Sequence, residues 1–137
     1  MVSYLIDSSA WIEFFRGTGS PANVRLRALI GDEASSLLGC PPVRMELAFD
    51  PHDLRRHRTL AVYDGFPSAG VDADDFSTTA DIYRSMRASG HTPRSITDCL
   101  IAAIGLRVAA TVVHNDVDFE RIAAAVPDLS VLRLPTA

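Results

Sequence analysis

Four acidic residues lie close to the expected ends of strands or starts of helices, which is where proteins of alternating strands and helices bind their ligands. Asp7 and Asp116 each follow a short apolar run typical of a buried strand, and each precedes a helix-like segment. Glu46 comes within two helical turns of another such run, and Asp98 lies at the start of a helix with almost no polar face. In an open parallel sheet, ligand sites gather beyond the carboxyl ends of the strands. The spacing therefore predicts that these four carboxylates converge on one pocket.

Carboxylates gathered in this way need positive charge among them, because like charges at close range repel one another strongly. The chain has no Lys, and ligands that are all oxygen atoms favour Mg2+ or Mn2+. A fifth acid, Asp118, lies just beyond Asp116. A metal in such a cluster lowers the pKa of an attacking water, and a second metal, if one binds, steadies the leaving oxygen. The cluster thus predicts hydrolysis of a phosphodiester bond.

Each acid also has a simpler explanation when it is taken alone. Asp7 and Asp116 could be N-caps of the helices that follow them. Ser95 and Asp98 match the spacing of a capping box, and Glu46 could be an ordinary solvated helix residue. It is the occurrence of all four at such positions that favours a shared site.

The composition limits the class of protein without excluding a nucleic-acid substrate. The 137 residues are 47% hydrophobic, so we expect one core and a single domain over residues 1–137. No apolar stretch reaches the roughly 18 residues of a membrane span, and no basic leader precedes Asp7. The net charge is −4, but if five of the 17 acids gather around metal, the other twelve are outnumbered by the 13 Arg. We expect Cys40 and Cys99 to be core residues in a reducing cytoplasm.

Short apolar runs alternate with helical patterns along the whole chain. We expect strands at 2–6, 34–40, 69–71, 110–113 and 129–132, and helices at 8–16, 22–30, from 41 on, 53–66, 74–89, 95–108 and 116–125. This alternation predicts an α/β fold with three layers, α/β/α, around a mainly parallel sheet of about four or five strands.

Two of the expected helices differ in their apolar surface. The helix 74–89 has Phe76, Ala80 and Tyr83 on one face. The helix 95–108 is apolar almost all round, so it should be central and buried. A carboxylate at the start of such a helix, as at Asp98, is hard to explain as a solvated residue.

Other chemistries find less support. The His residues show no metal-ligand spacing, and we expect surface or loop positions for them: His52, His57, His91 and His114. Ser8 and Ser9 have no evident His for a Ser–His–Asp arrangement. A phosphoaspartate domain would need a Lys, and an Asp-nucleophile phosphatase would need a second Asp at the position of Ser9.

Four short motifs contain the acids discussed above. In order they are Ile6-Asp7-Ser8-Ser9-Ala10-Trp11-Ile12, Met45-Glu46-Leu47, Ser95-Ile96-Thr97-Asp98-Cys99-Leu100-Ile101-Ala102-Ala103 and His114-Asn115-Asp116-Val117-Asp118-Phe119. They resemble the motifs of the PIN-domain nucleases, particularly the VapC toxins. Their order, their spacing and the length of the chain all fit, and the resemblance extends over essentially the whole chain.

The resemblance implies a PIN-like fold and a set of catalytic metal ligands: Asp7, Glu46, Asp98 and Asp116. Asp118 would touch the metal directly or through water, and Ser9 and Asn115 would orient ligands or the scissile phosphate. His114 and Asn115 stand where the family often has a Thr before its fourth acid, which leaves the coordination there open.

The resemblance also implies partners. The family cuts RNA endonucleolytically, commonly a structured RNA such as a tRNA, and leaves a 3′-hydroxyl and a 5′-phosphate. An antitoxin protein masks the toxin with its C-terminal segment, and family members usually form homodimers. The alternative is a PIN-like module that binds RNA or protein without cutting, although such modules usually lack some of the acids.

Basic and aromatic residues supply candidates for these contacts. For RNA we favour Arg94, with Arg84 and Arg87 as lesser candidates, because Arg forks fit phosphate oxygens. The run 55–58, Arg-Arg-His-Arg, is a further candidate RNA surface. The aromatic residues of the first helix either form an antitoxin-binding groove or fill the core: Trp11, Phe14 and Phe15.

Overall fold

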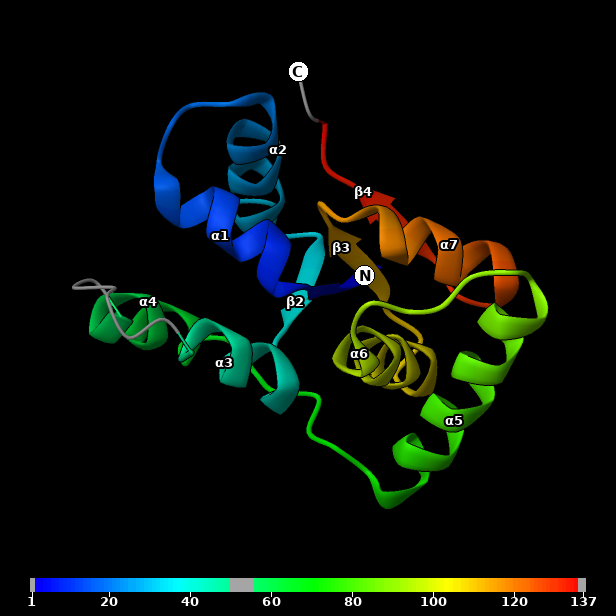
Figure 1. Ribbon diagram of the computed structural model, residues 1–137. Helices are drawn as coiled ribbons and strands as arrows, with labels where there is room; N and C mark the ends of the chain where they lie inside the picture. Colours follow the sequence, from blue (N-terminus) through cyan, green and yellow to red (C-terminus); the bar gives the residue numbers. More distant parts are fainter. Residues whose placement is uncertain (1, 50–55, 136–137) are drawn as a thin grey trace.

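A parallel sheet organises the chain. In the computed structural model, which describes residues 2–49 and 56–135, the strands are β1 (Val2–Ile6), β2 (Ser35–Leu38), β3 (Thr111–His114) and β4 (Val131–Arg133). They form one sheet in the order β2-β1-β3-β4, and all three strand pairs are parallel (Figure 1). The predicted parallel sheet is confirmed, with four strands.

The strands alternate with helices as expected. Within the same part of the chain the helices are α1 (Ser8–Arg16), α2 (Pro21–Ile30), α3 (Pro41–Leu47), α4 (Arg56–Tyr63), α5 (Ala73–Ala88), α6 (Ile96–Arg107) and α7 (Val117–Ala125). The beginning of the helix expected at 53–66 lies outside the described residues, as do His52 and Arg55. The described part of that helix is α4.

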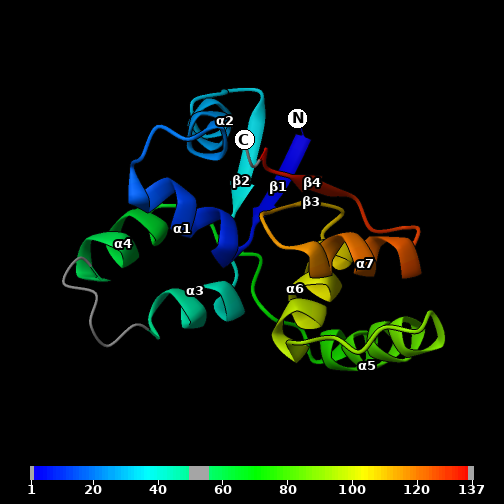
Figure 2. The same ribbon diagram turned by 45° about the horizontal axis from the view of Figure 1, so that its top comes forward.

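The order of the strands determines where a ligand can bind. From β1 the chain passes through α1 and α2 to β2 on one side, and it then returns through α3 to α6 to β3 on the other side of β1 (Figures 1 and 2). Because crossover connections are right-handed, this reversal puts α1 and α2 on one face of the sheet and α6 and α7 on the other. In an α/β/α arrangement of this kind, ligands bind beyond the carboxyl ends of the strands at the reversal, which are β1 and β3 here.

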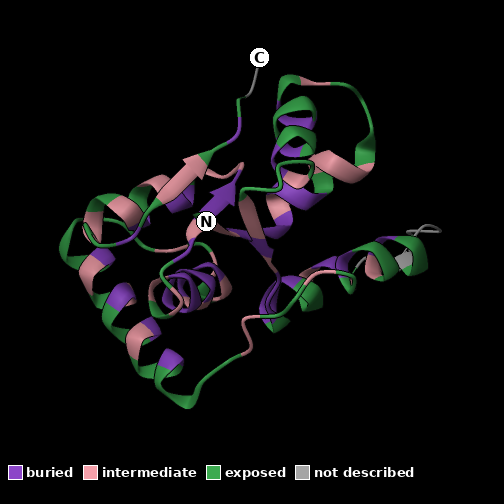
Figure 3. Cartoon of the chain, turned by 180° about the vertical axis from the view of Figure 1, so that it is seen from behind, coloured by how far each residue is buried: buried purple, intermediate pink, exposed green. Residues whose placement is uncertain are grey.

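Helix α6 is the centre of the core, as its composition predicts. Its buried apolar residues include Cys99, Ile101 and Ile104, and in Figure 3 it is buried along most of its length. A Cβ atom at Gly105 would lie 2.9 Å from Val112 Cγ2, so glycine lets α6 pack closely on β3. This packing holds the first turn of α6 beside the end of the sheet.

One expectation about the elements is wrong, and one face of an expected helix lies largely outside the core. Residues 69–71 form no strand, and only an isolated bridge joins Gly39 to Ser68 there. A short segment with Gly70 at φ 68° cannot continue a ladder. On α5, Phe76 and Ala80 are exposed, and Phe76 keeps 59% of its surface in solvent.

The inner face of α5 is partly polar. It consists of Asp75, Thr79, Ile82 and Met86. Asp75 is buried because Arg107 of α6 donates to both of its carboxylate oxygens, from Nε at 2.9 and 3.2 Å. The apolar periodicity alone therefore pointed to a face offset from the one that packs on α6. No helix within the described ranges is long and apolar enough to span a membrane.

Candidate active site

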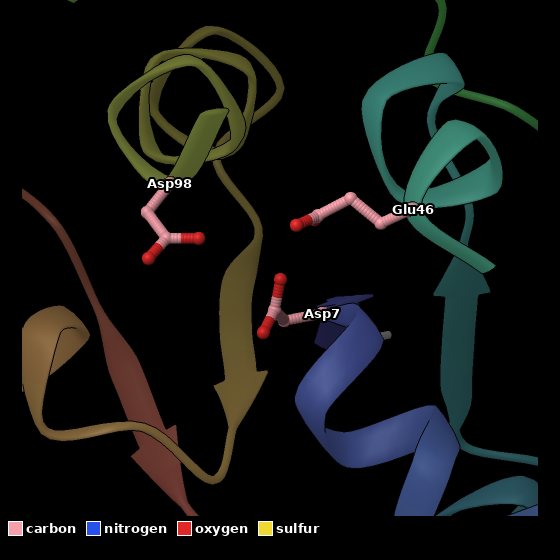
Figure 4. Close-up of side chains that lie close together, drawn as sticks. All are labelled: Asp7, Glu46 and Asp98. Atoms are coloured by element: carbon pink, nitrogen blue, oxygen red, sulfur yellow. The ribbon is translucent and has the colours of Figure 1, made fainter. Parts of the chain in front are cut away.

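Three of the predicted acids meet at the end of the sheet. Asp7 follows β1, Glu46 lies on α3 and Asp98 lies in the first turn of α6. One carboxylate oxygen of each lies within 4.8 Å of an oxygen of the others. Figure 4 shows these side chains pointing toward a common space between α1, α3 and α6. We refer to Asp7, Glu46 and Asp98 as the first triad.

A second group shares one member with the first. Asp98, Asp116 and Asp118 also have oxygens within 4.8 Å of one another, and we refer to them as the second triad. Asp116 is the N-cap of α7, and Asp118 lies in the first turn of that helix. All five acids that the sequence singled out are therefore brought together, with Asp98 between the two groups.

The two carboxylate oxygens of Asp7 have different surroundings. As the N-cap of α1, its Oδ2 accepts hydrogen bonds from the Ser9 backbone N–H at 3.1 Å and from the Ser9 hydroxyl at 2.6 Å. Its Oδ1 is buried and has no hydrogen-bond partner among the described residues. Burial raises the pKa of the carboxyl, although the bonds from Ser9 work against that rise. The capping explanation is correct for Asp7 but accounts for only one oxygen.

Ser9 joins the ends of the two central strands. While its hydroxyl donates to Asp7, the same oxygen accepts the backbone N–H of Asn115 at 2.9 Å. Asn115 follows β3, so Ser9 fixes the β3–α7 turn against the start of α1. Contact through the backbone of Asn115 uses no property of its side chain.

Glu46 is held by a residue that sequence reasoning considered only as a nucleophile. The Ser8 hydroxyl donates to Glu46 Oε1 at 3.1 Å, which links α1 to α3. Burial and the charges of Asp7 and Asp116 raise the pKa of Glu46, and the bond from Ser8 opposes that rise. Ser8 and Glu46 are 38 positions apart in the sequence, and no local sequence pattern predicts a contact between residues so far apart.

Asp98 is a buried acid with other acids as neighbours. Only 7% of its surface is exposed, and burial together with the negative charges of Asp7 and Glu46 raises its pKa to about 8. Ser95 makes no side-chain capping bond at the start of α6. The capping-box explanation is therefore wrong for Ser95 and Asp98.

Arg94 bridges the two outer acids of the second triad. Its Nη2 donates to Asp116 Oδ1 at 2.7 Å, and its Nε donates to Asp118 Oδ2 at 2.9 Å. Arg121 adds a longer ion pair to Asp118 at 3.5 Å. The predicted RNA contact at Arg94 is thus a residue of the acidic cluster itself.

The other predicted Arg contacts lie elsewhere. Arg84 pairs with Asp81 on the exposed surface of α5, and Arg87 donates to Thr92. Within residues 2–49 and 56–135, neither forms an ion pair with an acid of the two triads. Arg55 and the side chain of Arg56 lie outside what the structure describes.

His114 corrects the expectation of a surface position. It is fully buried, its Nδ1 accepts the backbone N–H of Asp116 at 3.2 Å, and its ring lies 5.2 Å from that of Phe119. Nε2 lies 3.0 Å from an oxygen of Glu120. Burial lowers the pKa of His114, in spite of the attraction of Glu120. A His inside the motif that carries Asp116 helps to shape the turn, because only its neutral Nδ1 can accept that bond.

The first helix divides its aromatic side chains between core and surface. Trp11 is 1% exposed and stacks on Phe15, so it belongs to the core rather than to a groove. Phe14 and Phe15 line a pocket of about 360 Å³ together with Val62 of α4 and Arg27 of α2. A pocket is therefore present beside two of the three rings, which also pack against the core.

The donor set of the first triad fits a divalent metal. Among the described residues, the cations that pair with the five acids are Arg94 and Arg121, and both reach only Asp116 or Asp118. The first triad thus has three carboxylates, one orphaned buried oxygen on Asp7 and no paired cation there. A buried cluster of this kind is stable when a hard cation with oxygen ligands occupies it.

Comparison with known proteins shows the family to which the chain belongs. The PIN domain family model matches residues 4–125. The chain is 49% identical over 121 residues to VapC ribonuclease Mb1587 of Mycobacterium bovis and to ribonuclease VapC11 of Mycobacterium tuberculosis. Each alignment covers 87% of this chain and 90% of the relative.

Solved structures share the fold at lower sequence identity. VapBC2 of Rickettsia felis, solved with a promoter DNA fragment, superposes with a TM-score of 0.75 at 14% identity, over 98% of this chain and 100% of that one. VapBC-5 of M. tuberculosis gives a TM-score of 0.68 at 23% identity, over 99% and 100%. VapC20 of M. tuberculosis, described as a toxin that cleaves the sarcin–ricin loop, gives 0.62 at 13%, over 85% and 92%.

Proposed function

Because this chain belongs to the PIN-domain family and, within it, to the VapC ribonucleases, we propose that it is a Mg2+- or Mn2+-dependent endoribonuclease toxin. The single observation that carries the metal dependence is the first triad. It holds three carboxylates at metal-ligand spacing without a paired cation among the described residues. A protein that only bound RNA would gain nothing from this costly arrangement.

The roles of the residues follow from their positions. Asp7, Glu46 and Asp98 would hold the metal, with Asp116 and Asp118 on the far side of Asp98. When bound, the metal lowers the pKa of a water and offsets charge on the phosphate. Glu46 is the half-buried member of the first triad, so its open side can accept the proton of the attacking water.

Ser8 and Ser9 act through other residues. Ser8 holds the carboxylate of Glu46, and Ser9 holds that of Asp7 while fixing the turn at Asn115. Attack of water on phosphorus, in line with the departing 3′ oxygen, would break the bond from phosphorus to that oxygen and leave a 3′-hydroxyl and a 5′-phosphate. We propose a structured RNA, such as a tRNA, as substrate, with Arg94 nearest to the phosphate and Arg84 and Arg87 farther out.

An antitoxin protein is the proposed partner. The pocket lined by Phe14, Phe15 and Val62 offers an apolar surface for a segment of such a protein, and Arg27 and Arg58 at its rim favour an acidic one. Replacing Val62 by Glu should weaken capture of the product of the neighbouring reading frame. Val24, exposed on α2, supplies the matched control, and equal capture by both Glu variants would contradict this position for the antitoxin.

We further propose that residues 1–137 act as one PIN domain, as a homodimer, in the cytoplasm. The support is the single core, to which elements from β1 to β4 contribute, and the two buried free thiols of Cys40 and Cys99. Gel filtration with light scattering tests the dimer, and a monomeric mass at micromolar concentration would contradict it.

The deciding experiment is cleavage of total cellular RNA by the purified, antitoxin-free chain with Mg2+ or Mn2+. EDTA and the Asp98→Asn variant are the negative controls, and Asp74→Asn, an exposed acid of α5, is the positive one. Discrete cuts that need metal and Asp98, mapped by sequencing, would support the proposal and name the RNA. If the folded chain binds RNA but cuts none, it is the non-catalytic module instead.

A further inference from the structure

The two triads differ in the cation that they already possess. Around the first triad, the described residues supply no Arg partner. In the second triad, Arg94 spans Asp116 and Asp118 with two hydrogen bonds of 2.7 and 2.9 Å. An Arg side chain keeps its charge at every pH at which proteins fold. The positive charge that Arg94 brings to the second triad is therefore permanent.

Arg94 lies against acids of different depth. The Asp118 side chain is only 4% exposed and that of Asp116 is 30% exposed, whereas the side chain of Arg94 is 64% exposed. The guanidinium thus closes the second triad from the solvent side. A metal ion that sought Asp116 and Asp118 together would have to displace it.

We propose that Arg94 takes the place of a second metal, so that the chain binds one divalent ion, at the first triad. This rests on the function proposed above and assigns the second cation of that same site. The two bonds to Asp116 and Asp118 use two of the five N–H donors of the guanidinium. The donors that remain face solvent and can hold a phosphate oxygen of the RNA beside the metal-bound one.

Counting bound Mn2+ tests this assignment without an activity assay. The metal-free chain is titrated with Mn2+ in an isothermal calorimeter, and electron paramagnetic resonance measures the Mn2+ that stays free. Both methods should give one bound ion per chain. Arg94→Gln keeps a polar side chain but removes the charge, and this variant should bind a second ion. Arg16→Gln, which removes an exposed Arg paired with Glu13, is the matched control and should bind one.

A third variant separates charge from folding. Arg94→Lys keeps the charge without the planar fork and should still bind one ion, and it serves if Arg94→Gln fails to fold. In the Gln background, Asp116→Asn should abolish the second ion.

Two ions in the unchanged chain, or one ion in both the unchanged chain and Arg94→Gln, would overturn the assignment of Arg94. Neither result would contradict the proposed function. No ion in the unchanged chain would contradict the metal site itself. Failure to cut RNA with the expected counts would contradict only the proposed function.

Discussion

Two buried carboxyls on neighbouring helices show how similar burial can serve different ends. Asp75 on α5 is 2% exposed, and Asp98 on α6 is 7% exposed. Burial alone would raise both pKa values. For Asp75, bonds from Arg107 and from the Asp72 backbone outweigh burial and hold its pKa below the usual value. Asp98 has acids for neighbours, which raise its pKa further.

The difference shows that a buried acid with a cationic partner indicates a structural function, whereas a buried acid among other acids indicates a chemical one. The paired Asp75 completes a capping box and ties α5 to α6, which is structural work. Asp98, for which the described residues supply no ion pair, has a raised pKa instead, and a buried carboxyl of this kind is typical of a functional site. Burial thus becomes a guide to function only together with the identity of the partners.

The largest expected effect is on catalysis. Asp98→Asn should lower the rate of RNA cleavage about 1000-fold or more, because a metal ligand of the first triad is lost. At pH 8 without metal, the same variant should unfold at a higher temperature than the unchanged chain, because it carries no buried negative charge there. A less stable Asp98→Asn protein would show that the carboxyl is structural after all.

Next in size is the effect of removing the paired acid. Asp75→Asn should lower the free energy of unfolding by about 2–3 kcal/mol, because it leaves Arg107 without its buried partner. Cleavage per folded molecule should not change. Asp74→Asn, on the exposed side of the same turn, should cost less than about 1 kcal/mol. Urea unfolding of both variants measures the difference, and equal losses would refute the contrast drawn above.

The pH dependence of stability should distinguish the two acids as well. The raised pKa of Asp98 means that the folded state keeps a proton that the unfolded chain releases near pH 4. Metal-free stability should therefore fall as the pH rises from about 4 to about 8, by at most about 1.4 kcal/mol per pH unit. Mn2+ should restore stability at pH 8. The absence of any slope in this range, in thermal unfolding curves, would argue against the raised pKa.

The smallest expected effect concerns Ser9. Ser9→Ala removes the hydroxyl that holds Asp7 and the Asn115 turn, and it should weaken Mn2+ binding about 10-fold to 100-fold. Ser9→Thr, which keeps the hydroxyl, should recover most of that affinity. Equal affinities for the Ala and Thr variants would rule out positioning by the hydroxyl.

The sequence was sufficient to predict the alternation of strands and helices and the convergence of the five acids. Both follow from periodicity and from the geometry of parallel strands. It did not predict the burial of His114 or the bond from Ser8 to Glu46, because each depends on how distant segments pack. Arg94 was placed near the site by its position alone, but its pairing with two acids of α7 depends on the tertiary fold.

The strand order also has a consequence for the time at which the enzyme becomes dangerous to the cell that makes it. Strand β1 is synthesised first, yet its neighbour β3 comprises residues 111–114, and the acids of α7 come later still. The five acids therefore cannot come together until the ribosome has passed residue 118. A chain made only up to α2 lacks four of the five acids, yet it already contains the part of the 360 Å³ pocket that Phe14, Phe15 and Arg27 line.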